Sequence, residues 1–404
     1  MYFELDDQDR QFRAEVRDFI RSTLPKEISE RRRRSGYNAF KIHEDMLHWT
    51  NLLDELKGWA VPHWPKEHGG TGWTPMQHFI FQEEQWAADC PSQNVQGVHL
   101  VGPIVYMFGN EEQKRRFLVP IRNGKSYWCQ GFSEPGAGSD LASLRTSAVL
   151  EGDKWIVNGQ KIWTSGASGS DWGFFLVRTD NSGKKQEGIS FLLIRMDTPG
   201  ITVRAIPAIH GDNHLCEVFL DNVEVPAENL IGEAGKGWGY AKELLDLERT
   251  DSSFIYATKR EISRLLELAR REKLLTGDSR RSHSIAARIA RADALTSALE
   301  WSVLRVLGHE QRSYKATPIA SALKLRGAEL QQLITELYVD LLGNKSLRHF
   351  GHLDLESWRG QGDDYWHDEI PGRTFSMLYC RAATVFGGAR QVQSNIIAKT
   401  AFNL

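Results

Sequence analysis

The amino-acid sequence predicts an α+β protein in which a central β domain separates two helical regions. Apolar residues recur at helical spacing near the N-terminus, and short apolar runs bounded by Gly, Asn or Asp follow from about residue 126. Helical spacing returns in 240–275 and 285–307. At 404 residues, the chain is long enough for two or three domains.

The N-terminal region is predicted to contain helices over 7–22, 43–59 and 76–88. In the first of these, charged residues separate one apolar face, which consists of Phe12, Val16, Phe19 and Ile20. Prolines and glycines in 62–65 and 69–72 predict a loop between the later helices.

The central region is predicted to form strands. These are expected over Trp155–Val157, Phe174–Val177, Ile189–Ile194, Ile201–Val203 and Glu217–Leu220. Asn158-Gly159 lies between two apolar runs and predicts a hairpin, because a type I′ turn needs positive φ at both central residues. Trp163, Thr164 and Ser165 are then expected at the end of the second strand of that hairpin.

Composition excludes several function classes. A net charge of −2 gives no reason to expect nucleic acid or an anionic membrane as a partner. No stretch approaches the roughly 18 apolar residues of a membrane span, and the first residues show neither the basic region nor the apolar core expected of a signal peptide. The 4 cysteines are scattered without a Cys-x-x-Cys pair, which argues against a zinc site and fits a reducing cytoplasm.

One run of arginines and two pairs of histidines are expected to be structural. Arg31–Arg34 follows Glu30 in a charged helical stretch, which favours a solvated face over a docking patch.

His210 and His214 are four residues apart, but the intervening Gly211, Asp212 and Asn213 disfavour a helix that would aim both side chains one way. His349 and His352 have only Gly351, Asp354 and Asp364 nearby. Without a helical His-Glu-x-x-His motif or a cysteine partner, no metal site is expected.

The glycine-rich segment 128–148 is the most informative part of the chain. Gly136 and Gly138 flank Ala137 and leave the backbone N–H groups unshielded, while Ser133, Ser139 and Asp140 add side-chain hydrogen-bonding groups. Such a segment can lie against a polar ring or a phosphate. It lacks the third glycine of a dinucleotide fingerprint and the Gly-Lys-Ser/Thr of a phosphate loop. Taken alone, it could equally be a glycine turn between a helix and a strand.

Together with 155–167, this segment resembles the flavin-binding signature of the acyl-CoA dehydrogenase family. The resemblance continues through Val223–Gly232, Gly235–Trp238 and Gly387–Ile397, in the same order along the chain. It implies the fold of that family, with an N-terminal helical domain over 1–125, a β-barrel-like domain over 126–235 and a C-terminal four-helix bundle over 236–404.

The resemblance also implies a reaction. Members of the family use FAD to remove two hydrogens across the α and β carbons of an acyl-CoA thioester, and a carboxylate takes the α proton. In many members a glutamate lies just before a C-terminal Gly-Thr, but here that position is Gly387. Other members place the base on the first long helix of the C-terminal domain, and Leu245–Arg249 resembles that pattern. Glu248 is therefore the expected base, and the alternative is a surface glutamate in a charged helix.

The same resemblance assigns the binding residues. Flavin is expected to be lined by Gln130, Phe132, Ser133, Gly138 and Ser139, with Trp163, Thr164 and Ser165 at its ring system and Gln391 as a further cofactor contact. Ser139, Asp246 and Arg249 are expected to hold the pantetheine and nucleotide arm of the thioester.

Two segments depart from the homomeric members of the family. Their Arg-x-x-Phe-Gly and Gln-x-x-Gly-Gly segments, which reach the flavin across a subunit interface, are absent at Arg271–Asp278 and Val339–Asn344. Gly58–Trp73 and Trp128–Ser143 resemble the large subunit of pimeloyl-CoA dehydrogenase. The resemblance thus implies an unlike partner subunit in an α2β2 assembly, unless Arg280 or Arg281 replaces the missing arginine. Electron-transfer flavoprotein is the expected electron acceptor.

Two other functions stay open from the sequence. The chain could be a non-catalytic subunit that completes a partner's site, or a flavin oxidase or monooxygenase of the same fold. If the chain is a dehydrogenase and the polar run Thr250–Ser253 after the expected base faces the acyl pocket, it favours a carboxylated, hydroxylated or ring-bearing acyl group over a plain fatty acyl chain. The alternative is that these side chains face solvent.

Overall fold

The computed structural model describes residues 4–36, 43–251, 253–309, 318–347, 370, 372–402 and 404, and for residues 246–251, 308, 309 and 347 only the backbone. The chain divides into two compact units. The helical unit comprises Met1–Ala39, Trp73–Pro91 and Arg249–Leu404, and the β-containing unit comprises Phe40–Gly72 and Ser92–Glu248. The predicted domain boundaries at 125/126 and 235/236 stay a prediction.

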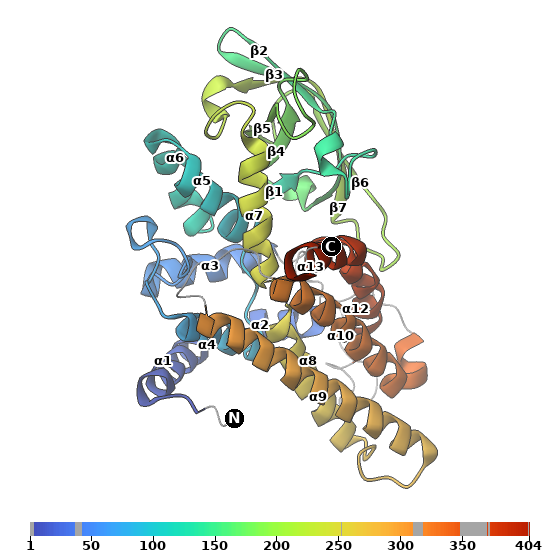
Figure 1. Cartoon of the computed structure of the whole chain (residues 1–404). Coiled ribbons are helices and arrows are strands. Elements are labelled where there is room, and N and C mark those ends of the chain that lie inside the picture. Colours follow the sequence, from blue (N-terminus) through green and yellow to red (C-terminus); the bar gives the residue numbers. More distant parts are fainter. Residues whose placement is uncertain are drawn as a thin grey trace. The chain divides into compact units, whose positions relative to one another are not determined.

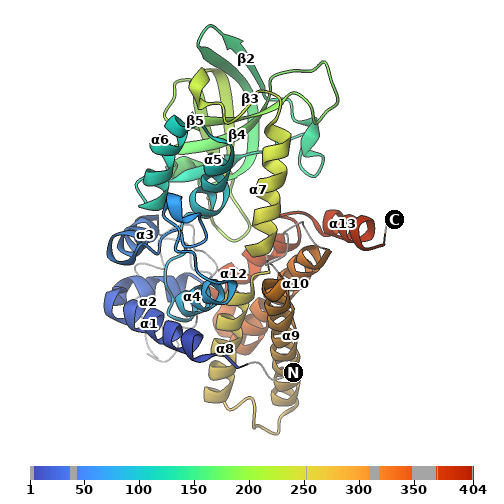
Figure 2. The ribbon, with the colours of Figure 1, turned by 60° about the vertical axis from the view of Figure 1, so that its left-hand side comes forward.

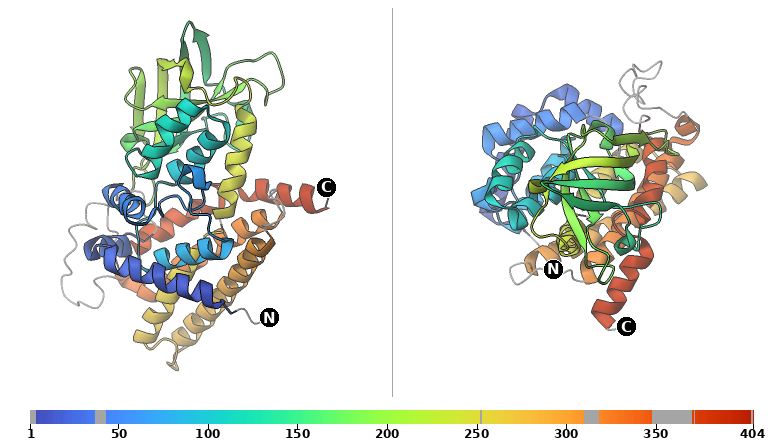
Figure 3. Two further views of the ribbon diagram at one scale, coloured as in Figure 1. Left: turned by 90° about the vertical axis from the view of Figure 1, so that its left-hand side faces the viewer. Right: turned by 90° about the horizontal axis from the view of Figure 1, so that it is seen from above.

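The helical unit joins helices from both ends of the chain. Its elements are α1 (Asp7–Thr23), α2 (Lys26–Ser35), α4 (Pro75–Ala87), α8 (Ile255–Arg271), α9 (Arg280–His309), α10 (Pro318–Leu342), α12 (Arg373–Tyr379) and α13 (Arg390–Phe402). The long helices α9 and α10 pack against each other and against α8 (Figures 1 and 3). Phe79 of α4 belongs to the same apolar core as residues of these three helices.

Helix α1 confirms the first predicted helix. Asp6 caps its N-terminus by accepting a hydrogen bond from the backbone N–H of Asp9, and all four residues of the predicted apolar face are buried. Helix α4 begins with a capping box in which Thr74 and Gln77 each accept from the other's backbone N–H. The predicted helix over 43–59 is α3 (His43–Lys57) of the β-containing unit.

The helical pattern predicted over 240–275 is not continuous. Helix α7 (Gly237–Asp251) begins in the β-containing unit and ends before Phe254, which adopts a φ of 54° and precedes α8. The backbone of α10 comes very close to this break, since a Cβ on Gly327 would lie 2.1 Å from the Ser253 carbonyl oxygen. Periodicity could not reveal the break, because the apolar spacing is similar on both sides of it.

The β-containing unit is built on a seven-stranded sheet. Its strands are β1 (Trp128–Gly131), β2 (Ser147–Glu151), β3 (Lys154–Ser165), β4 (Trp172–Arg178), β5 (Ile189–Arg195), β6 (Ile201–Ala205) and β7 (Leu215–Pro226). The order is β1-β4-β2-β3-β7-β6, with β5 paired to β4. All five predicted strand segments lie within β3 to β7.

Both faces of this sheet are covered. Strand β4 directs Phe174 into one apolar cluster and Phe175 into another, as the two-residue period of a strand requires. The first cluster includes residues of α5 (Gly102–Phe108) and α6 (Glu111–Arg122), which lie beside β4 and β5 (Figures 1 and 2). A strand buried on both sides reads as a continuous apolar run, which is the pattern of β4.

The predicted hairpin turn at Asn158-Gly159 is wrong. Strand β3 runs through these residues, and the hairpin lies one step earlier, where Glu151 pairs with Lys154 and Gly152 adopts a φ of 63°. Asn158 instead marks a register shift between β3 and β7. Glycine follows it because a Cβ at Gly159 would lie 2.5 Å from the Thr146 hydroxyl.

The arginine run is not a solvated face. Arg32 is 3% exposed, lies over the Trp86 ring at 5.1 Å and donates a hydrogen bond to the Gly36 carbonyl. All four cysteines are buried and none forms a disulfide. Among the residues described, no helix has both the length and the apolar content needed to cross a membrane.

Candidate active site

The two segments predicted to hold flavin lie side by side. The backbone N–H of Ile162, in β3, donates to the Ser133 carbonyl at 2.9 Å, in the loop that follows β1. This bond places the glycine-rich loop beside the end of β3, where Trp163, Thr164 and Ser165 lie. The structure therefore brings together residues that are about 30 positions apart in the chain.

A buried ion pair fixes this arrangement. Lys161 Nζ lies 2.8 Å from Glu134 Oε1 and 3.2 Å from the Phe132 carbonyl oxygen. The Glu134 carboxylate also accepts the backbone N–H groups of Arg145 and Thr146, at 2.6 and 2.9 Å. One carboxylate thus ties both ends of the glycine-rich loop to β3.

Burial and charge act in opposite directions on this pair. Burial would raise the pKa of Glu134, but the Lys161 ammonium and the hydrogen bonds lower it below its usual value. Burial lowers the pKa of Lys161 to about 8 against the attraction of Glu134. Both groups are therefore charged at neutral pH.

Neither residue of this pair was predicted as a site residue from the sequence. Lys161 lies at an inward position of β3, where the alternation of the strand calls for an apolar residue. A lysine at such a position is the signal that could have found it, because a buried ammonium needs a carboxylate partner.

The tip of the glycine-rich loop faces open space. Glu134 and Ala137 exchange backbone hydrogen bonds of 3.0 Å, which closes a tight turn around Gly136. A Cβ added to Gly136 or Gly138 would meet no heavy atom within 4 Å, and Ser139 is exposed. An accessible backbone of this kind offers N–H donors to a phosphate or a polar ring.

Trp163 has an unusual conformation. Its φ is 64° and its side chain is 56% exposed, although it is a large apolar residue. The strand pairing shifts register between Lys161 and Thr164, and this irregularity turns Trp163 outward. A positive φ at a bulky residue is strained and is often retained for function. An exposed indole beside an open glycine loop suits the binding of a flat ring system.

Matches to three family models decide the identity of the chain. The acyl-CoA dehydrogenase N-terminal domain matches residues 6–125, the middle domain matches 129–223 and the C-terminal domain matches 235–402. The chain belongs to the acyl-CoA dehydrogenase family. It is therefore an oxidoreductase that acts on acyl-CoA, and members of this family are FAD-dependent.

Individual relatives agree with this assignment. The chain is 36% identical over 403 residues to the acyl-CoA dehydrogenase IpdE1 of Mycobacterium tuberculosis, covering 98% of this chain and 97% of the relative. The IpdE1 of Mycolicibacterium smegmatis is 32% identical over 412 residues, with the same coverage.

Solved structures of the family are also similar. The Tcur3481-Tcur3483 steroid ACAD has a TM-score of 0.84 and 26% identity over 100% of this chain and 99% of that one. The ChsE4-ChsE5 complex of Mycobacterium tuberculosis has a TM-score of 0.81 and 29% identity, with the same coverage.

The other residues of this acyl-CoA dehydrogenase that were predicted to line the flavin differ in how much of their surface is exposed. Gln130 and Ser133 are half-buried, whereas Phe132 packs edge-on against Phe174, with ring centroids 5.6 Å apart. Thr164 is 1% exposed. Phe132 and Thr164 therefore present almost no surface to a ligand, whereas Gln130 and Ser133 do.

The expected base and two thioester contacts lie on helix α7. The backbone of Asp246, Glu248 and Arg249 is helical, but their side chains lie outside the described part of the chain. Gln391 is exposed on α13, in the helical unit. His349, His352, Asp354 and Asp364 also lie outside the described residues.

The turn around Gly387, near the C-terminus of this acyl-CoA dehydrogenase, is held by a buried lysine. Gly387 adopts a φ of 62°, which favours glycine at this position. Lys324, fully buried in α10, donates to the carbonyls of Ala383 and Gly388 at 3.0 and 2.9 Å. Gly387 therefore allows the backbone of the turn to take this conformation, and it provides no carboxylate at the position where many members of the family carry a glutamate.

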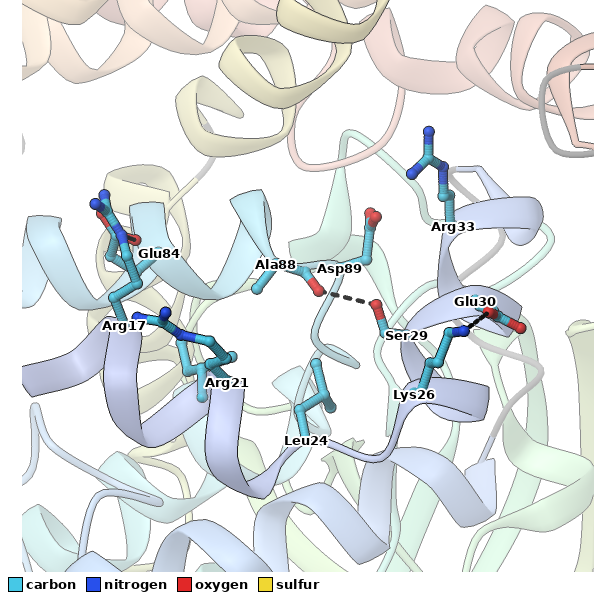
Figure 4. Close-up of a pocket in the computed structure, with 11 residues that line it drawn as sticks. Arg17, Arg21, Leu24, Lys26, Ser29, Glu30, Arg33, Glu84, Ala88 and Asp89 are labelled. Carbon is cyan, nitrogen blue, oxygen red and sulfur yellow. Dashed lines mark hydrogen bonds and ion pairs between the residues drawn. The ribbon is translucent and has the colours of Figure 1, made fainter. Parts of the chain in front are cut away.

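A pocket of the helical unit does not contain the predicted site. It has a volume of about 540 Å³ and is lined by α1, α2 and the end of α4 (Figure 4). In this pocket the Arg17 guanidinium donates two hydrogen bonds, of 2.9 and 2.8 Å, to the Glu84 carboxylate. The Ser29 hydroxyl donates to the Ala88 carbonyl at 3.1 Å. None of the predicted flavin or thioester residues lines it.

Proposed function

We propose that this chain is the catalytic subunit of an FAD-dependent dehydrogenase that converts an acyl-CoA thioester to its trans-2-enoyl-CoA. The observation that carries the proposal is that the glycine-rich loop is held against the end of β3. The Ile162–Ser133 hydrogen bond and the Glu134–Lys161 ion pair hold it there. In a member of this family, the same two segments form the flavin-binding signature.

The residues of the site have distinct roles in this proposal. The accessible backbone of Gly136, Gly138 and Ser139 would donate N–H groups to the cofactor, and Trp163 would contact its ring system. Bound flavin supplies the hydride acceptor of the reaction. Glu248 takes the α proton, and desolvation by the bound acyl chain brings its pKa closer to neutrality. Hydrogen bonds to the thioester oxygen stabilise the enolate-like charge that forms.

The assignment of Glu248 has a direct test. Glu248→Gln keeps the size of the side chain but cannot take a proton, so turnover should fall by about 10²–10⁴-fold. Flavin content and acyl-CoA binding should stay close to wild type. Activity above roughly a tenth of wild type would show that another carboxylate acts as base.

The same assay separates the alternative functions. Turnover is measured with an artificial electron acceptor and, in parallel, with oxygen alone. A dehydrogenase requires the acceptor, and an oxidase reacts with oxygen alone. A non-catalytic subunit, assayed together with its partner subunit, leaves turnover unchanged when Glu248 is replaced by Gln. Transfer of the electrons to electron-transfer flavoprotein is part of the proposal and is tested by using that protein as the acceptor.

We further propose a ring-bearing or otherwise substituted acyl group as substrate. One of the similar structures is a steroid ACAD, and Ser253 of this chain is polar yet 3% exposed. A buried hydroxyl near the acyl group would need a polar partner, which a plain fatty acyl chain does not provide. A clear preference for octanoyl- or palmitoyl-CoA in a thioester panel would overturn this substrate class.

An unlike partner subunit completes the proposed enzyme. Helix α8 ends at Arg271 without the arginine segment of homomeric members. Arg281 is already engaged, since it donates to the carbonyls of Asp340 and Leu341 at the end of α10. One similar structure is a complex of two named subunits. We therefore expect α2β2 with fewer flavins than subunits, and a homotetramer with one flavin per chain would overturn it.

A further inference from the structure

The turn between β6 and β7 gathers two imidazoles and a carboxylate. The metal-ligating atoms of His210, Asp212 and His214 all lie within 4.8 Å of one another. Asp212 Oδ2 is 3.2 Å from His214 Nδ1, and the two imidazole centroids are 5.6 Å apart. The three residues are 5%, 0% and 8% exposed. From the sequence no metal site was expected here, because the residues between His210 and His214 disfavour a helix that would aim both side chains one way.

A tight turn, not a helix, aligns these side chains. Gly211 adopts a φ of 82° and its N–H donates to the Ala208 carbonyl at 2.8 Å, while the Ala208 N–H donates to the Asp212 carbonyl at 2.9 Å. Asp212 Oδ1 accepts the backbone N–H groups of Asn213 and His214. These bonds fix one carboxylate oxygen and leave Oδ2 beside the His214 ring.

We propose that His210, Asp212 and His214 bind a divalent transition-metal ion of the zinc class. Two imidazoles and one carboxylate form a donor set that suits Zn²⁺, Co²⁺ or Fe²⁺ and not Mg²⁺ or Ca²⁺, which prefer all-oxygen sites. The Asp212 charge partly balances the ion in a place shielded from water. Its Oδ1 hydrogen bonds act as the outer shell that orients a metal-ligating carboxylate.

The site adjoins the segment that follows Trp163. The Gly166 N–H donates to the His214 carbonyl at 2.7 Å, and the strand register places Ser165 opposite Leu215 and Thr164 opposite Cys216. An ion at this turn would therefore stiffen the end of β3. The inference rests on the geometry of the turn and does not depend on the proposed dehydrogenase activity.

Metal binding can be measured directly on the full-length flavoprotein. The protein is treated with a chelator and then titrated with Zn²⁺ by calorimetry and with Co²⁺ by visible absorption. We expect one ion per chain, a rise in melting temperature, and a Co²⁺ spectrum with d–d bands of nitrogen and oxygen ligation. Absence of a stoichiometric Zn²⁺ and Co²⁺ site in the wild type would overturn the proposal and leave an ordinary Asp–His pair.

Variants locate the ion. His210→Ala should weaken Zn²⁺ binding by about 100-fold or more, since even outer-shell changes cost about 10–100-fold. Asp212→Asn keeps an Oδ1 acceptor for the turn while removing the ligand charge, so it should fold and still lose affinity. His283→Ala, at an exposed position of α9, is the control and should bind as wild type does. Unchanged affinity in both turn variants would place the metal elsewhere.

Discussion

The two units of this acyl-CoA dehydrogenase each bury an ionic cluster, and the two clusters are built differently. The β-containing unit has one cation and one anion, Lys161 and Glu134, whose side chains are 0% and 7% exposed. The helical unit has what we call the arginine cluster. Among the residues described, its members are Arg32, Asp89, Arg260, Glu261, Arg264 and Arg373.

The difference lies in charge balance. Glu134 and Lys161 neutralise each other, and each also bonds to backbone of the glycine-rich loop. Among the described residues, the arginine cluster sets four guanidinium groups against two carboxylates. Arg264 has no hydrogen-bond acceptor for its Nε, Nη1 or Nη2 among the described residues, and lies 3.7 Å from Asp89. The balanced pair should act as one positioning unit, whereas residues of the arginine cluster should differ in the sign of their contribution.

The largest effect is expected from breaking the balanced pair. Lys161→Met leaves the Glu134 carboxylate buried without its cation, which should lower the free energy of unfolding by about 3–5 kcal/mol. The glycine-rich loop should then lose its fixed position, so the protein should also lose flavin. Denaturant unfolding and the flavin-to-protein absorbance ratio measure the two effects.

Two controls sharpen this test. The double variant Glu134→Gln with Lys161→Met removes both charges and should recover part of the lost stability, because no uncompensated ion remains. Lys154→Met changes a lysine of the same strand whose side chain is 49% exposed and pairs with Glu224 at the surface. It should leave the free energy of unfolding almost unchanged, because solvent screens an exposed pair. A cost for Lys154→Met equal to that of Lys161→Met would remove the special role of the buried pair.

The same comparison explains what the sequence could reveal. Local patterns sufficed where the cause is local, as in the apolar face of α1 or the helical spacing that predicted α4. They also sufficed for β4, whose burial on both faces leaves a continuous apolar run. The family resemblance singled out the glycine-rich loop and the end of β3, but not the Ile162–Ser133 hydrogen bond that joins them.

Features that depend on distant partners were missed. The Asn158-Gly159 signal was misread because contact with Thr146, not a turn, explains the glycine. Arg32 is buried because the Trp86 ring lies over it, and no local pattern encodes that ring. Lys161 needs Glu134, which is 27 positions away in the chain. In each case the deciding interaction is tertiary. For the arginine run, the charge pattern alone had favoured a solvated face.

A smaller effect, dependent on pH, is expected at Glu261. Burial would raise its pKa, but Arg373, Arg260 and the neighbouring arginines hold it near 2, below the usual 4.5. A carboxylate with a lowered pKa in the folded state stabilises the protein above its unfolded pKa, and this stabilisation is lost as the pH falls through the folded pKa. Glu261→Gln should therefore cost about 2–3 kcal/mol at pH 7.

The gap between wild type and Glu261→Gln should narrow as the pH falls from 4.5 towards 2. Unfolding measured at pH 7 and at several values below 4.5 gives this profile. A gap that stays constant across the range would mean that the pKa of Glu261 is the same in the folded and the unfolded protein, so the neighbouring arginines would not stabilise its charge.

The smallest effect, and the one that most clearly separates the two clusters, is expected at Arg264. Burial lowers its pKa, and so do the charges of Arg373 and Arg260. Met can replace the aliphatic stem of arginine in packing while removing one of the excess buried charges. Arg264→Met should therefore change the free energy of unfolding by less than about 1 kcal/mol, and any change should be stabilising.

Arg260→Met is the matched control, from the same helix and the same cluster. Arg260 donates to Glu261 at 2.6 Å and pairs with Asp89, so its loss removes charge-assisted bonds and should destabilise the protein by about 2–3 kcal/mol. Equal losses for the two variants in denaturant unfolding would show that Arg264 has a counter-charge of its own in solution. The arginine cluster would then be balanced, as Glu134 and Lys161 are, and the contrast between the two units would disappear.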